Sequence, residues 1–600
     1  MMRTRGKKTA ALVKTAEAED DDQDEYLVVN KSLLTELVNS SVQSHGLTSC
    51  TNPHFKVQRV VRRVISVDLK LTCDNCSFDS GRKSMYRTMT KKLSHACNDN
   101  NDNNDNDQAL EGGRGNRAST LNAALASAVL NSMIGQTQIR QIFLQIGVDI
   151  GCKNSLCNLI DQVGEIKKNL ANKSMENAVT ELVAQESLCP GSTFVTQDGY
   201  YNNRFGKGPT QAGTQSHYTS LGHIIDNEGN RISCKIIDHQ TDNKLCKKGK
   251  ELASKNWGSC AEGHPDCTAT LPAAEAIGQE GRLCKQSLEK LRSQGYIPKL
   301  ICVDGDDSIK KNVKAFCKDY GCEIDLAFDP NHVYKNLDKT LNTKHKFLVD
   351  QSVPGKTKRL RETAMSQLAI DLQKRCRSET KQACLKYRDI KDDNEKIDKI
   401  CQLLSGTKNA ILNCLQGQCK DECKDKSLVC NGEKGQDSLK YALSQKITLS
   451  DDNQKIARDR IDLYFHKTII HKVHTLTHTN INESIHRGFQ RVMPKITTYS
   501  KNYMAKTSSE ILHFNEGFDV AVLLVLEKLE HKICNKVKIQ LKTMATTNEN
   551  QQNHAKKKET KKRKRTNLVK VFEEHREYRN GPSGRSSGTY QKGRDLREED

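Results

Sequence analysis

The chain has 600 residues, and its 95 Lys and Arg residues exceed its 74 Asp and Glu residues by 21, which gives a formal charge of +21. No apolar run approaches the roughly 20 residues that a membrane-spanning helix needs, so the sequence excludes a membrane protein. The length suits several domains. The positive charge favours nucleic acid as a partner, with a merely solubilising surface as the alternative.

The N-terminal third is predicted to be an arm followed by an accessory region. Residues 1–48 open with basic and acidic sequence that holds almost nothing apolar, and we expect a disordered arm there. Residues 49–190 form an accessory α+β region. It comprises a strand or hairpin over Val57–Thr72, an Asn- and Asp-rich linker at 98–108, and a helical pair over Leu121–Val148. Two ordinary packed helices are favoured there over a DNA-binding helix-turn-helix.

The remaining chain is predicted to be a catalytic core that an insertion divides. Residues 191–345 contain three β-rich runs, then helix, strand, helix and strand, an order typical of a ribonuclease H-like mixed α/β sheet. Residues 346–471 are a helical, Cys-containing insertion, and 472–540 complete the core. Residues 541–600 are a basic, disordered tail whose run Lys556–Arg565 indicates nuclear localisation or phosphate binding. We therefore expect the protein in the nucleus.

Three acidic residues lie where such a sheet would bring them together. Asp198 ends the first β run, Asp304 ends the strand LICVD, and Glu483 lies at the start of a later helix. The first and fourth strands of this sheet are neighbours, so these carboxylates would converge. Three such groups can hold two Mg²⁺ or Mn²⁺ ions for phosphodiester chemistry, whereas solvated turn residues are the alternative.

The 23 cysteines of a chain without an export signal indicate reduced thiols or metal ligands. Cys73 and Cys76 form a C-x-x-C after a β run, with His95 and Cys97 about twenty residues later, which suits Zn²⁺ better than a redox pair. A second group has irregular spacing, and a structural zinc site and scattered free thiols remain equal alternatives for it. Its members are Cys414, Cys419, Cys423 and Cys430.

A series of stretches in fixed order carries a family resemblance over Val57–Lys528. The series is VDLKLTCDNC, TLNAALASAVLNSMIGQTQIRQIFLQIGV, VTQDGYYNNRFGKG, EGHPDCTATLPAAEAIGQEG, VDGDDS, DPNHVYKNL, TNINESIHRGFQRVMPK and LHFNEG. On these stretches the chain resembles the Mutator-like transposases of animal DNA transposons. The resemblance implies a DDE enzyme that cuts and joins double-stranded DNA, at transposon ends and target, on a ribonuclease H-like fold.

Carried over to this chain, the resemblance assigns Asp198 as the first acid and Glu483 as the third. The second is Asp304, with Asp306 as a helper or replacement. The element Asp329-Pro-Asn-His332 matches a short Cys-or-Asp, two residues, His pattern of the family. His332 would then lie near the DNA, contacting phosphate or a flipped base, whereas a helix-capping histidine is the alternative.

Four basic residues close to these positions in sequence are candidates for holding DNA phosphates. They are Lys335, Arg487, Arg491 and Lys495. Pairing of two DNA ends favours a homo-oligomer. The rival functions are a catalytically silent, host-adopted DNA-binding protein and a metal-dependent ribonuclease on the same fold.

Overall fold

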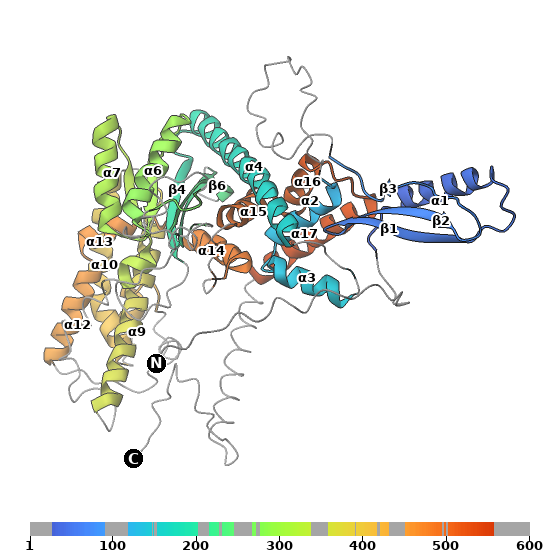
Figure 1. The fold of residues 1–600 in the computed structure, drawn as a ribbon. Coiled ribbons are helices and arrows are strands. Elements are labelled where there is room, and N and C mark those ends of the chain that lie inside the picture. Colours follow the sequence, from blue (N-terminus) through green and yellow to red (C-terminus); the bar gives the residue numbers. More distant parts are fainter. Residues whose placement is uncertain are drawn as a thin grey trace, which may run out of the picture. The chain divides into compact units, whose positions relative to one another are not determined.

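The computed structural model describes most of the chain in two compact units (Figure 1). The N-terminal unit comprises residues up to Asn169 with 504–509 and 522–533. The second unit comprises 170–503, 510–521 and the remainder, and we name it the catalytic unit after the role that the sequence predicts for it. The described residues are 27–89, 118–146, 148, 153–201, 215–226, 231–244, 246, 267–271, 277–335, 337, 358–390, 392–416, 421–430, 451–494, 497, 499 and 502–556. Within these ranges, no helix has the length and apolar character needed to cross a membrane.

The N-terminal unit begins with helix α1 (Lys31–His45), which packs on an antiparallel sheet of order β1-β2-β3 (Figure 1). Leu37 of α1 is buried with three alternating residues of the central strand β2, so the period-2 pattern of that strand forms the contact. The β-rich run predicted at Val57–Thr72 is therefore a hairpin. The strands are β1 (Phe55–Arg63), β2 (Ser66–Cys73) and β3 (Lys83–Ser84).

Helix α1 lies inside the segment that was predicted to be a disordered arm, and this part of the prediction is wrong. The Asn30 side chain accepts hydrogen bonds from the backbone N–H groups of Ser32 (3.0 Å) and Leu33 (3.3 Å), which caps the helix. The helix is only weakly amphipathic in sequence. Its order comes from packing against β2, which the sequence of the arm does not reveal.

The helical pair predicted at Leu121–Val148 is present as α2 (Thr120–Leu130) and α3 (Gln136–Gln145). Asn122 of α2 accepts a hydrogen bond from the backbone of Ile65 (3.2 Å) and donates to Ser66 Oγ (2.8 Å). These buried bonds fix α2 to the β1–β2 turn. The next helix, α4 (Lys153–Leu188), runs from this unit into the catalytic unit.

The catalytic unit contains a five-stranded mixed sheet of order β6-β5-β4-β7-β8. The pairs β4–β5 and β5–β6 are antiparallel, whereas β4–β7 and β7–β8 are parallel. This is the predicted meander followed by two crossover strands, and the unit has a mixed α/β fold. The strands are β4 (Thr193–Tyr201), β5 (Gln215–Ile225), β6 (Arg231–Asn243), β7 (Leu300–Val303) and β8 (Asp325–Phe328).

Helices cover both faces of this sheet, so β5 is buried along nearly its whole length. On one face lie α6 (Glu280–Ser293) and α7 (Asp307–Tyr320), side by side in Figure 1. Tyr218 of β5 and Cys284 of α6 both donate to Gln197 Oε1 of β4 on this face. On the other face, the His217 ring stacks on Phe489 of α14 (Asn480–Val492) with 5.0 Å between ring centroids.

The predicted insertion forms its own helical cluster, with a core that includes the buried side chains of Ile397, Leu404 and Ile461. The basic tail was predicted to be disordered from residue 541, but α17 continues to Lys556, so that boundary is wrong. The remaining helices are α9 (Lys358–Lys386), α10 (Asp393–Leu415), α11 (Asp421–Lys426), α12 (Asp451–Tyr464), α13 (Lys467–Val473), α15 (Tyr503–Glu516), α16 (Phe518–Lys528) and α17 (Asn535–Lys556).

Candidate active site

Strand register aligns three aspartates at one edge of the catalytic sheet. Thr196 pairs with Cys302 between the parallel strands β4 and β7, so Asp198 and Asp304 each follow the same paired position by two residues. Asp198 lies within β4, three residues before the end of the strand at Tyr201, so the prediction that it ends the first β run is wrong, whereas Asp304 directly follows β7. Both side chains leave the same face of adjacent strands, which are about 4.8 Å apart. Asp329 follows β8 in the equivalent place, because Val303 pairs with Phe328.

Helix α14 brings Glu483 to this edge. Its buried face repeats at helical spacing through Asn482, Ile485, His486 and Phe489, while Glu483 stays exposed in the first turn. The buried Asn482 side chain accepts from Thr196 Oγ1 (2.7 Å) and donates to the carbonyl oxygen of Thr219 (3.0 Å). This clamp on β4 and β5 fixes the start of the helix, and therefore the place of Glu483.

His332 lies between the second and third predicted acids. Its Nδ1 atom is 3.2 Å from Asp304 Oδ2, and its Nε2 atom is 3.9 Å from Glu483 Oε1. The ring belongs to the helical segment 330–335 that follows β8. His332 thus faces the carboxylates, a placement that neither predicted role describes. The three predicted acids lie together, and His332 bridges two of them.

Asp329 organises the loop before α14. Its Oδ2 atom accepts from the backbone N–H of Thr479 (2.8 Å), and its Oδ1 atom accepts from that of Asn331 (2.7 Å). Although burial raises its pKa, the nearby His478 ring and these N–H donors together lower the pKa of Asp329 to about 2. Thr479 Oγ1 also lies within hydrogen-bonding distance of both Asp329 Oδ2 (3.0 Å) and Asp304 Oδ1 (3.1 Å).

Asp198 and Asp304 are largely removed from solvent, and the neighbouring carboxylates repel one another there. Burial, followed by the charges of Asp304, Glu280 and Glu483, raises the pKa of Asp198 to about 9. Burial also raises the pKa of Asp304. Raised pKa values favour the protonated forms, so ionised carboxylates at this site need a nearby positive charge. His486 Nδ1 lies 3.4 Å from Asp198 Oδ2, and the backbone N–H of Gly199 also donates to this carboxylate. Oxygen ligands that crowd in this way fit a hard divalent cation.

Glu280 is a fourth acid at this edge, and sequence analysis missed it. It lies in the first turn of α6, and the Tyr201 hydroxyl donates to its Oε1 atom over 2.6 Å. A side chain at Gly199 would approach Glu280 Oε1 to 2.6 Å, so glycine there admits the carboxylate. Burial raises the pKa of Glu280. The acid closes the segment EGHPDCTATLPAAEAIGQEG, so the family resemblance already contained it.

Gly278 supports this fourth acid, and Gly278→Ala is expected to cost about 3 kcal/mol of unfolding free energy. Its φ is +67°, and a Cβ atom would lie 1.6 Å from the Tyr201 ring, which would break the Tyr201–Glu280 hydrogen bond. Gly295→Ala is the matched control, because Gly295 has a φ of +82° with nothing within 4 Å of an added Cβ. Urea unfolding should show the control losing only about 1 kcal/mol. Equal losses of unfolding free energy in the two variants would contradict a steric clash between the added Cβ atom and the Tyr201 ring.

The other predicted site residues have distinct places. Asp306 is exposed and caps α7, where its side chain accepts from the backbone N–H of Ser308 over 2.8 Å, because β7 ends at Val303 instead of continuing to it. Arg487 and Arg491 are exposed on α14 at four and eight residues from Glu483, which is one helix face. Lys335 is exposed on the segment 330–335, and Lys495 lies outside the described residues.

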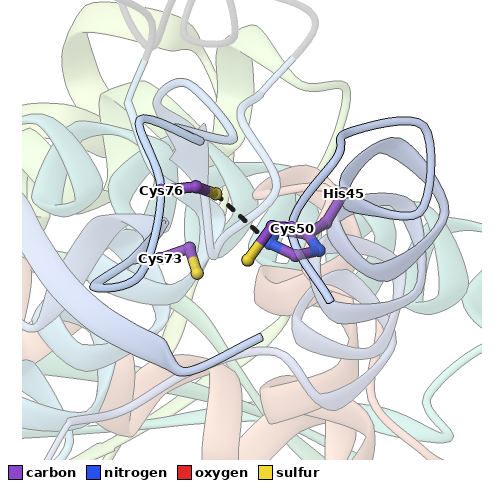
Figure 2. Close-up of side chains that lie close together, drawn as sticks. All are labelled: His45, Cys50, Cys73 and Cys76. Carbon is purple, nitrogen blue, oxygen red and sulfur yellow. Dashed lines mark hydrogen bonds between the residues drawn. The ribbon is translucent and has the colours of Figure 1, made fainter. Parts of the chain in front are cut away.

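The predicted cysteine groups are partly assembled. Cys73 and Cys76 gather with His45 and Cys50, as Figure 2 shows, whereas His95 and Cys97 lie outside the described residues. Burial raises the pKa of Cys73, but hydrogen bonds from the backbone of His54 and Asn75 and from the His45 and Cys76 side chains lower it to about 6.

In the insertion, three of the four predicted sulfur atoms come together in a buried cluster. Cys414 Sγ is 3.8 Å from Cys423 Sγ, and Cys430 lies within the same group. The Arg375 guanidinium approaches Cys414 Sγ to 3.7 Å. Cys419 lies outside the described residues. The irregular spacing in sequence is therefore compatible with one compact group.

Comparison with known families adds an independent line of evidence. The family model described as Mutator-like transposase matches residues 25–430, a range that contains Asp198, Glu280 and Asp304 and ends before Glu483. No curated protein matches the chain. Because the matched range covers more than half of the 600 residues, the chain belongs to the Mutator-like transposase family.

Proposed function

We propose that this protein is a DDE-class transposase that cuts and joins DNA strands at a site built from Asp198, Asp304 and Glu483. The observation that supports the proposal is the register of β4 and β7, because Asp198 within β4 and Asp304 just after β7 follow the same paired position by two residues. Both lie on the side of the sheet that α14, the helix of Glu483, covers. Family membership implies DNA binding and a nuclease or recombinase activity in general terms. The carboxylate cluster supports the more specific proposal of DDE-class cleavage and joining of DNA strands.

We further propose that the catalytic sheet is ribonuclease H-like. An antiparallel meander precedes two parallel crossover strands, and the first and fourth strands, β4 and β7, are neighbours. The proposed metal ligands thus gather towards the carboxyl end of the parallel strands, where open α/β sheets commonly bind ligands. The helical insertion enters the chain between β8 and α14, and therefore between the second and third acids.

Asp198, Asp304 and Glu483 would hold two Mg²⁺ or Mn²⁺ ions, with Glu280 beside them. When bound, these ions activate an attacking oxygen and stabilise a leaving oxygen. A water oxygen attacks the phosphorus, and the bond to the 3′ oxygen breaks, which leaves a 5′ phosphate and a 3′ hydroxyl. That hydroxyl then attacks the phosphorus of a target phosphodiester, whose bond to its own 3′ oxygen breaks, so the target strand is left with a free 3′ hydroxyl. His332 orients Asp304 and Glu483 through its two ring nitrogen atoms.

The exposed face of α14 is the proposed phosphate-binding surface. Arg487 and Arg491 continue along the helix from Glu483, so a strand whose phosphate reaches the acids would pass both guanidinium groups. Lys335 follows His332 by one helical turn and would add a further contact. Such contacts supply affinity without base specificity. Placement of the protein in the nucleus and assembly of a homo-oligomer on paired ends belong to the same proposal.

An excision assay tests the proposal and identifies the second acid. Cells would carry a marker between the terminal repeats of the element that encodes the chain. We expect excision by the wild type, loss with Asp304→Asn, and retention with Asp306→Asn, because asparagine is as good a helix cap as aspartate. Loss with Asp306→Asn alone would reverse the assignment. DNA binding without excision by the wild type would instead favour the catalytically silent protein.

A further inference from the structure

We propose that His45, Cys50, Cys73 and Cys76 bind one structural Zn²⁺ ion that joins the end of helix α1 to the end of strand β2. The site is separate from the carboxylate cluster and does not depend on the proposed catalysis. It consists of three thiols and one imidazole from two segments of the N-terminal unit. Figure 2 shows the four side chains converging on a common centre.

The geometry matches a tetrahedral site. One donor atom of each residue lies within 4.8 Å of the other three, and Cys76 Sγ is 3.4 Å from His45 Nε2. Zinc bonds of about 2.3 Å to sulfur and 2.0–2.1 Å to nitrogen place tetrahedral donors about 3.5–3.8 Å apart. The group therefore needs only a small contraction to close around the ion.

The local sequence presents the donors in two pairs. Cys73 is the last residue of β2, and Cys76 follows on the turn, where the backbone N–H of Cys73 donates to the carbonyl of Phe78 over 3.2 Å. His45 ends α1, and Cys50 follows in the loop, where its N–H donates to Thr48 Oγ1 over 3.3 Å. A C-x-x-C turn and an H-x₄-C turn thus face each other.

The surroundings hold the imidazole in place. The His45 ring meets Phe55 and Phe78 edge to face, with centroids 5.1 and 5.3 Å away. Its side chain is buried, although it carries polar nitrogen atoms. An aromatic enclosure that leaves Nε2 facing three sulfur atoms favours a metal ligand over a solvated histidine.

A second layer of polar contacts ties the two turns together. His54 Nδ1 is 2.9 Å from Asp74 Oδ2, and the N–H of Asp74 donates to the carbonyl of His54 over 3.0 Å. The Asn75 side chain donates to the carbonyl of Asn52 over 2.7 Å. These contacts join the loop that carries Cys50 to the turn that carries Cys73 and Cys76, as expected around a fixed metal site.

The size of the local core explains why a metal is needed. Among the described residues, the buried part of the cluster between α1 and the sheet consists of Leu37, Val67, Leu69, Leu71 and Met85, and the hydrophobic residues packed against it, Leu27, Val29, Leu33, Leu34 and Phe55, are only partly buried. A core of this size supplies little stability, and small modules commonly depend on a structural metal. Three soft thiolates with one imidazole select Zn²⁺ over Mg²⁺ or Ca²⁺. A Cys73–Cys76 disulfide would use two of the four donors and leave His45 without a role.

Metal content of the purified full-length chain tests the proposal. We expect His45→Asn and Cys50→Ser each to lower the zinc content by one ion per chain, measured by plasma mass spectrometry. His45→Cys should keep that ion, because a thiolate also binds zinc, and this swap separates a ligand from a packing residue. Cys189→Ser, at an exposed cysteine, and Cys97→Ser are the controls, and both should keep the full content.

A second measurement needs no variant and so does not depend on folding of the mutants. A chelator should make Cys50, Cys73 and Cys76 of the wild type reactive to alkylation together, with Cys189 as the exposed reference that is reactive throughout. Full zinc content in His45→Asn and Cys50→Ser would overturn the proposal, as would loss of zinc in Cys97→Ser. Equal alkylation of the three cysteines with and without chelator would also overturn it.

Discussion

Asp198→Asn is expected to abolish Mg²⁺-dependent strand cleavage while the fold and DNA binding persist. The change removes one charged ligand from the cluster, and metal assistance is worth several kcal/mol, about a thousandfold in rate or more. Asparagine has nearly the shape of aspartate, so the buried place beside His486 stays filled. Cleavage of labelled duplex ends, measured beside binding to the same duplex, checks both parts of the expectation.

Asp198→Asn is also expected to change how the stability of the protein depends on pH, separately from its effect on cleavage. Because the pKa of Asp198 is raised to about 9, its favourable contribution to the metal-free fold is complete below about pH 4 and is lost as the pH rises to about 9. Asparagine does not titrate, so the variant keeps this favourable contribution to stability at every pH. With chelator present, thermal unfolding of Asp198→Asn should match the wild type near pH 4 and occur at higher temperature near pH 9.

With Mg²⁺ in place of the chelator, the wild type should unfold at a higher temperature than Asp198→Asn. A ligand that binds only the folded state stabilises that state, and the wild type binds Mg²⁺ with one more charged ligand. Two results would count against the assignment. One is retained cleavage by Asp198→Asn. The other is an equal Mg²⁺-induced rise in the unfolding temperature of both proteins, because an ion bound elsewhere would not distinguish them.

Asp329→Asn is expected to lower the unfolding free energy by about 2–3 kcal/mol at pH 7 and cleavage roughly a hundredfold. The pKa of Asp329 is about 2 in the folded protein, below the ordinary value of about 3.9. Its contribution is therefore present above about pH 4 and is lost as the pH falls to about 2. The stability gap between variant and wild type should narrow over that range. Chemical unfolding from pH 2 to 7 measures it.

The loss of cleavage has a different origin from that of Asp198→Asn. Asp329 acts through Thr479, which lies beside both Asp329 and Asp304 and immediately precedes α14. It is a positioning residue, so Mg²⁺ should still stabilise the variant. Asp325→Asn, at the exposed start of β8, is the matched control and should change stability by less than about 0.5 kcal/mol. A pH-independent gap would contradict the role given to the Asp329 charge.

The sequence by itself determined the order of elements in the catalytic unit. Strands β4 to β8 were predictable because their β-branched runs end at glycine and asparagine turns. Asp304 was visible just after one of these strands, whereas Asp198 lies inside β4, which continues to Tyr201. Cys73 and Cys76 were visible because their spacing is local. These features depend on residues that lie near one another in the chain.

Only the tertiary structure decided which distant residues meet. Glu280 reaches the acids because Gly199 and Tyr201 lie across from the start of α6, and Asp329 meets Thr479 from 150 residues away. His45 joins Cys73 because α1 packs on β2, in a segment that is predicted from its charged, apolar-poor start to be a disordered arm. Strand register and helix packing set these contacts. Both arise from burial over the whole unit, which no local pattern encodes.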